Sequence, residues 1–201
     1  CSLVAMPPVP SPVTLPPVPG PELLVEEIVR HQWEMMLEAI ADRPELCQER
    51  PGSYRTMREI TNAALRPDTL RSYLGELRNA RLAGRNLVEE KLALLRRPAP
   101  ATRNPFVPRI VAIETAWMGE LVERSPFTFR GALSDFARDV ACELATLSDA
   151  TVTLLYRDVL AAREEGRNLQ RERYEEFFRR TGRGTLEEVE AKERAKVPDA
   201  I

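Results

Sequence analysis

Several features that identify enzymes and binding domains are absent from this 201-residue sequence. It contains three cysteines, Cys1, Cys47 and Cys142, whose number and spacing exclude a disulfide framework and a zinc motif. Free cysteines are typical of a reducing compartment, and no apolar run is long enough to cross a bilayer. We therefore expect a cytoplasmic protein. Lipid anchoring through Cys1 is the alternative, but removal of an initiator methionine or trimming explains that residue more simply.

The charge balance and the missing motifs exclude further classes of protein. A net charge of −2 argues against a nucleic-acid-binding domain, which is normally basic. No phosphate-binding loop, dinucleotide fingerprint or serine nucleophile elbow is present, so the sequence identifies no cofactor. His31 is the only histidine, which excludes a histidine-rich metal site. A magnesium site on Glu34, Glu114 or Glu120 is a weaker alternative, and we expect no metal.

What is present is an internal duplication. Gly84-Arg85-Asn86-Leu87 recurs as Gly166-Arg167-Asn168-Leu169. Upstream, the segment that begins at Trp33 resembles the segment that begins at Trp117. Because such a duplication determines architecture before any motif does, we expect two tandem three-helix repeats that pack face to face with pseudo-two-fold symmetry.

The hydrophobic pattern is helical throughout, and no segment shows sustained alternation of apolar and polar residues. The expected fold class is therefore all-α, with both repeats in one domain. The expected segments are a proline-rich arm (1–21), repeat 1 (22–97), a proline-rich hinge (98–108), repeat 2 (109–182) and a C-terminal helix with its tail (183–201).

Each repeat is expected to contain a long third helix. The first would run over 69–96 with Asp68 as its N-cap, and the second would run to residue 180 with Ser148 or Asp149 as its N-cap. Thr185 and Glu188 have capping-box spacing at the start of the last helix.

The duplicated glycines fall inside these long helices, where each costs about 1 kcal/mol relative to alanine. Close approach of another helix backbone is the simplest reason for them. Arg81 and Arg163 precede the glycines by three positions, on or beside the apolar stripe, where an unpaired charge is unfavourable. Two interpretations stay open: polar networks that lock the repeats together, or a pocket that holds a carboxylate or phosphate. The pocket would be lined by Arg58, Arg81, Arg85, Asn86, Arg163, Arg167 and Asn168.

Cys47 and Glu90 are the candidate reactive residues. Cys47 lies in an irregular stretch near arginines, where a lowered pKa would make it a nucleophile. A semi-buried thiol that fills a gap is the alternative. Glu90 shares a helix face with Asn86 by its spacing. Cys142, by contrast, has the spacing of a core residue.

Several short blocks of the sequence together point to a known family. They are Cys47-Gln48, Tyr54-Arg55-Thr56-Met57-Arg58, Ser72-Tyr73-Leu74, Gly84-Arg85-Asn86-Leu87 and Glu90-Lys91. Through these blocks the chain resembles a bacterial helical family catalogued as domain of unknown function 4125. The resemblance covers nearly everything after Glu22, implies a bacterial protein of uncertain activity, and supplies no catalytic residue. Gln32 and Leu92 depart from the family pattern, which has an acidic residue and an aromatic residue at these positions.

These observations support two functions. The leading hypothesis is an Arg/Asn-lined pocket between the repeats that binds a small anionic molecule; an enzyme with this pocket would be an accessory enzyme of specialised metabolism. The alternative is a non-enzymatic helical adaptor that binds a protein partner through its helical faces and proline arm. A homodimer stays open, and the sequence identifies neither a reaction nor a substrate.

Overall fold

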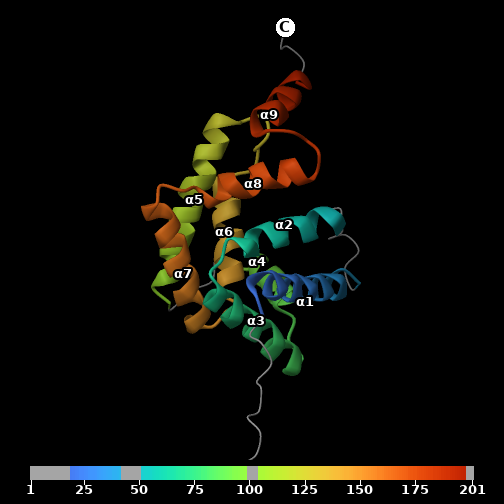
Figure 1. The fold of residues 1–201 in the computed structure, drawn as a ribbon, viewed down its shortest axis with the longest axis vertical. Helices are drawn as coiled ribbons and strands as arrows, with labels where there is room; N and C mark the ends of the chain where they lie inside the picture. The colour runs from blue at the N-terminus through green and yellow to red at the C-terminus, as the bar shows by residue number, and fades with distance from the viewer. Residues whose placement is uncertain (1–18, 42–50, 99–103, 198–201) are drawn as a thin grey trace, which may run out of the picture.

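The computed structural model describes residues 19–41, 51–98 and 104–197, and all secondary structure in these ranges is helical (Figure 1). The all-α class is therefore confirmed for these residues. None of the helices in these ranges is both long and apolar enough to span a membrane. Cys47, most of the proline-rich arm and the middle of the hinge lie outside the described residues. The helices are α1 (Pro21–Ala41), α2 (Pro51–Ala63), α3 (Pro67–Leu82), α4 (Leu87–Leu95), α5 (Phe106–Arg124), α6 (Leu133–Leu144), α7 (Asp149–Glu164), α8 (Leu169–Arg180) and α9 (Leu186–Ala195).

Each long third helix expected from the sequence is in fact two helices, because a glycine ends the first of them. Gly84 has φ +66° and Gly166 has φ +71°, a conformation in which residues with a Cβ are strained. The N–H groups of Gly84 and Arg85 donate to Arg81 O and Ala80 O at 3.0 and 2.8 Å, which is a Schellman C-cap. Nothing lies within 4 Å of a Cβ built on either glycine, so close approach of another backbone is not the reason for them.

Asn86 and Asn168 begin the helices that follow, because each side-chain oxygen accepts backbone N–H groups of the first turn. Each Nδ2 also donates to an earlier helix, from Asn86 to Met35 O at 2.8 Å and from Asn168 to Trp117 O at 3.1 Å. Met35 and Trp117 each lie 51 positions before the asparagine that binds their carbonyl oxygen, whereas the predicted match pairs Trp117 with Trp33.

The other predicted caps had mixed outcomes. Ser148 caps α7, and Thr185 makes the expected capping box at α9. Asp68 is not the N-cap of α3, because that helix begins earlier, with Arg66 as its N-cap and a proline in its first turn. Asp68 instead lies inside the first turn, where an acidic side chain interacts favourably with the helix dipole.

The first half (21–95) and the second half (106–180) use their helices in corresponding ways. In the first half, α1 packs against α2, α3 and α4, and in the second half α5 packs against α6, α7 and α8. The halves meet where α2 packs on α8, α3 on α7, and α4 on α6. Helix α9 packs on α8 near the C-terminal end of the molecule (Figure 1).

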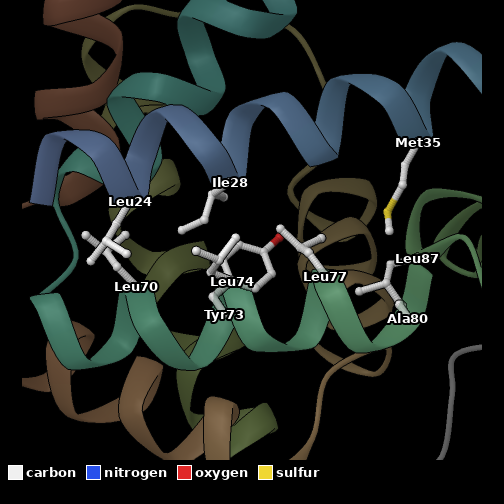
Figure 2. Packing of buried hydrophobic residues seen from close by; sticks show 9 residues of the cluster. All are labelled: Leu24, Ile28, Met35, Leu70, Tyr73, Leu74, Leu77, Ala80 and Leu87. Carbon is white, nitrogen blue, oxygen red and sulfur yellow. The ribbon is translucent and has the colours of Figure 1, made fainter. Parts of the chain in front are cut away.

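Three apolar clusters hold these helices together. In the first, side chains of α1 face those of α3, with Leu87 of α4 beside them (Figure 2). The second surrounds Trp117 between α5 and α7, and the third buries Leu186 and Val189 of α9. Cys142 is fully buried in α6, as its spacing predicted.

Candidate functional site

A cavity of about 790 Å³ lies between the two halves, and side chains from all of α1 to α8 contribute to its wall. This volume is within the range of small-molecule sites. Much of the wall is aromatic or aliphatic, including Trp33, Leu92, Phe136, Val140 and Tyr174. The cavity is therefore suited to a molecule with an apolar body.

Four charged side chains form an ion-pair network in the cavity wall. Glu143 of α6 accepts hydrogen bonds from Arg58 Nη1 at 2.7 Å and from Lys91 Nζ at 2.8 Å. Lys91 also donates to Asp139 Oδ2 at 2.8 Å. The side chains of Arg58 and Lys91 are only 20% and 16% exposed, whereas Asp139 is 49% exposed. The network thus joins α2 and α4 to α6 and places its positive charge deepest.

The network keeps its buried groups ionised. Burial alone would raise the pKa of Glu143, but the adjacent charges of Arg58 and Lys91 outweigh it and hold that pKa far below its usual range. Burial alone would lower the pKa of Lys91, but the carboxylates of Glu143 and Asp139 together outweigh burial and raise that pKa. A general acid or base needs a pKa near the working pH. This network is therefore better suited to binding charge than to transferring protons.

A second polar group in the wall comes from the second half alone. Glu114 of α5 accepts hydrogen bonds from Gln170 and from Arg173 Nη1, the latter at 3.0 Å. The Glu114 and Arg173 side chains are only 7% and 12% exposed. Two opposite charges that are buried together in this way offset each other, so this pair adds no net charge to the cavity.

Leu92 and Gln32, the two positions expected to depart from the family pattern, lie in the cavity wall and next to it, respectively. Gln32 is buried, donates to Tyr73 Oη at 2.8 Å and accepts a hydrogen bond from Asn62 at 3.1 Å. Tyr73 and Asn62 line the cavity, and burial raises the pKa of Tyr73 well above its usual value. Gln32 therefore positions two neutral polar side chains of the wall.

Most of the predicted ligand-binding residues lie away from this cavity. Arg58 is part of its wall, but Arg81 pairs with Glu34 and Glu38 of α1, and Arg163 is exposed. Asn86 and Asn168 are N-caps. Of these residues only Arg58 is in the cavity wall, and Arg81, Asn86 and Asn168 contact partners in their own half.

The remaining predicted residues also have local partners. Arg85 pairs with Glu90 at 2.7 Å, and Arg167 pairs with Glu172 at the same distance. Glu90 is thus an ion-pair partner of Arg85, outside the cavity wall. In the described ranges, no group of three His, Cys, Asp or Glu side chains is placed to hold a metal ion.

Sequence reasoning did not select Lys91, Glu143 or Arg173 as site residues, and it considered Glu114 only as a metal ligand. One signal for the acidic residues was available. Glu114 lies between Ile113 and Trp117 on an apolar helix face, and Glu143 lies beside Leu144 on another. A carboxylate on an apolar stripe requires a buried partner. The sequence does not reveal which cation approaches it.

No curated protein and no solved structure matches the chain. A model of the family described as "Protein of unknown function (DUF4125)" matches residues 22–191, which is most of the sequence, and the chain therefore belongs to this family.

Proposed function

We propose that the protein binds a small organic anion with an apolar body in the cavity between its halves. The observation that carries the proposal is the sharing of one partly buried carboxylate, Glu143, by two partly buried cations, Arg58 and Lys91. Arg58 and Lys91 together carry one positive charge more than Glu143 neutralises, and the half-exposed Asp139 offsets it. An anionic ligand that takes the place of Asp139 on Lys91 neutralises the same charge and also fills the cavity.

The wall supports an apolar body for this anion. Trp33 and Phe136 are among the aromatic side chains of the wall, and apolar surface removed from water contributes about 25 cal/mol per Å². The charged groups then determine the orientation of the ligand, as is usual in small-molecule sites. The pKa of Glu143 lies far below its usual range and that of Lys91 lies above its usual value, so both groups stay charged, which favours binding over acid–base catalysis.

We also propose that the two halves are tandem repeats related by a pseudo-two-fold axis, with four helices in each. Support comes from contacts that recur between residues matched in the sequence. Arg85 with Glu90 corresponds to Arg167 with Glu172. The pairing of α2 with α8 corresponds to that of α6 with α4. A cavity on such an axis receives equivalent wall segments from both halves.

A protein-binding adaptor has less support. Such a surface needs contiguous exposed apolar area. The large apolar side chains exposed in the described ranges are Leu23, Leu37, Leu82 and Val197. Leu23 and Leu37 lie near opposite ends of α1, Leu82 ends α3, and Val197 follows α9.

Native mass spectrometry of the full chain, purified from its own host, tests the proposal. We expect a bound molecule of a few hundred daltons that is recovered as an organic acid after denaturation. Titration with anthracene-2-carboxylate, a fluorescent apolar anion, provides a second measurement. If no organic acid is bound and the probe does not bind either, the proposed function is excluded.

Matched lysine variants locate the site. Lys91→Gln is expected to weaken probe binding about tenfold, the effect of losing one charge-assisted hydrogen bond. Lys192→Gln, on the exposed surface of α9, is expected to leave it unchanged. Circular dichroism confirms that both variants are folded. Equal affinities in the two variants would place the anion elsewhere.

A further inference from the structure

Two side chains of the cavity wall carry a buried donor that has no hydrogen-bond partner among the described residues. They are Tyr54, through its Oη, and Arg173, through its Nε. Tyr54 is only 8% exposed, and the Arg173 side chain is only 12% exposed. A buried donor left without a partner costs about 1–3 kcal/mol. Two such donors in one cavity therefore call for an explanation.

The two donors lie on helices that pack against each other, Tyr54 on α2 and Arg173 on α8. Their neighbours hold them in place. The ring centres of Trp33 and Tyr54 are 6.0 Å apart, and the Arg58 guanidinium carbon lies 5.4 Å from the centre of the Tyr54 ring. The Nη atoms of Arg173 are fixed by Glu114 at 3.0 and 3.4 Å, so Nε is its free donor. The ring and the guanidinium that carry the two donors are thus held by neighbouring side chains.

The other buried atoms without a partner in the described ranges lie in His31, Thr115 and Arg138. None of these residues is part of the cavity wall. The coincidence of two unpaired donors with the cavity is therefore a property of the site.

We propose that the ligand is an oxygenated aromatic carboxylate, whose ring-borne carbonyl oxygen accepts hydrogen bonds from Tyr54 Oη and Arg173 Nε. This rests on the proposed function, in which the carboxylate takes the place of Asp139 on Lys91. A carbonyl group fits because both unpaired groups are donors, and a carbonyl oxygen has two lone pairs. The aromatic side chains of the wall fit a planar ring system between the two polar positions.

Two pairs of probes test this selectivity. Anthraquinone-2-carboxylate and 9-fluorenone-2-carboxylate carry ring carbonyls, whereas anthracene-2-carboxylate and fluorene-2-carboxylate have nearly the same shape without them. We expect the full chain to bind at least one carbonyl-bearing probe about tenfold more tightly than its partner, because a site with buried donors rejects a ligand that leaves them unpaired. Isothermal titration calorimetry measures each dissociation constant.

Two conservative variants assign the preference to the donors. Tyr54→Phe removes Oη and keeps the ring, and Arg173→Lys removes Nε and keeps a cation beside Glu114. Each is expected to reduce the preference for the carbonyl-bearing probe while affinity for its partner stays within about twofold. Absence of any preference in the native chain, or a preference that survives in both variants, would overturn this inference. Failure of all four probes to bind would instead overturn the proposed function.

Discussion

Asp158, on α7, accepts a 2.7 Å hydrogen bond from the hydroxyl of Thr69 in the first turn of α3. It also accepts the backbone N–H of Arg66, the N-cap residue of α3, at 3.0 Å. The opposite arrangement exists as well, because Glu76 of α3 accepts the hydroxyl of Thr151 in the first turn of α7 at 2.8 Å. Each of these two helices thus supplies an acceptor to the start of the other, which fixes the contact between the halves.

Asp158→Ala is expected to lower the free energy of unfolding by about 3 kcal/mol, because it leaves the Thr69 hydroxyl and the Arg66 N–H without their acceptor. The Asp158 side chain is only 3% exposed, and Thr69 is fully buried. Urea denaturation followed by circular dichroism measures the loss. Glu165→Ala is the comparison, since that carboxylate is 57% exposed and 3.4 Å from Arg167, and it is expected to change stability by less than about 0.5 kcal/mol. Equal losses would show that Asp158 is not a buried cap.

Substitution of glycine by alanine is expected to have opposite effects at two kinds of position. Gly84→Ala and Gly166→Ala are each expected to lower the free energy of unfolding by about 1–2 kcal/mol, because both positions have positive φ. Gly75→Ala is expected to raise it by about 0.5–1 kcal/mol, because Gly75 is inside α3 and an added Cβ meets no atom within 4 Å. Thermal unfolding of the three variants provides the measurement. Stabilisation by Gly84→Ala would contradict the Schellman caps.

Local sequence signals predicted the helical class, and they also contained the helix breaks that we missed. A glycine followed two residues later by an asparagine is a helix stop and then a helix start, as at Gly84 and Asn86. The apolar spacing continues through both breaks, and for this reason the sequence analysis predicts one long helix instead of the glycine stop and asparagine start. Once the helices are broken, Arg85 no longer faces a second repeat and pairs with Glu90.

The cavity was harder to predict because its contacts join distant parts of the chain. Lys91 meets Glu143 only because α4 packs on α6. Hydrophobic periodicity indicates which face of a helix is buried, but it does not indicate which helix covers that face. Arg58, a predicted ligand-binding residue, lies in the cavity wall, but nothing in the sequence identifies Glu143 as its partner.

The double variant Arg85→Ala/Arg167→Ala separates the cavity from the duplicated motif. Both arginines are more than two-fifths exposed, and their ion pairs are screened by water. We therefore expect a total loss of less than about 1 kcal/mol in the free energy of unfolding, and unchanged affinity for anthracene-2-carboxylate. Loss of probe binding in the folded double variant would mean that the anion binds at the Gly-Arg-Asn segments and not in the cavity.

Glu143 is expected to make stability depend on pH below about pH 5. Its pKa in the folded protein is far below the ordinary value of 4.5, so the unfolded chain takes up a proton first as the pH falls. The stabilisation is complete above the unfolded pKa and is lost as the pH falls toward the folded pKa. Urea denaturation between about pH 7 and about pH 3 should show a shallower decline for Glu143→Gln than for the native chain. Glu165→Gln, at an exposed site, should retain the native decline.

Asp139 is expected to compete with the ligand for Lys91, so its removal should strengthen binding. Asp139→Asn keeps the shape of the side chain but removes the half-exposed charge that lies 2.8 Å from Lys91 Nζ. Such a pair contributes up to about 1 kcal/mol, so affinity for anthracene-2-carboxylate should rise about fivefold. Asp135→Asn, at an exposed position of the same helix, should leave affinity unchanged and corrects for the altered net charge. Glu143 stays ionised beside Lys91 in both variants. An increase in probe affinity in Asp139→Asn alone would therefore mean that the ligand replaces the Asp139 carboxylate. A decrease in probe affinity would mean that Asp139 helps to hold the ligand.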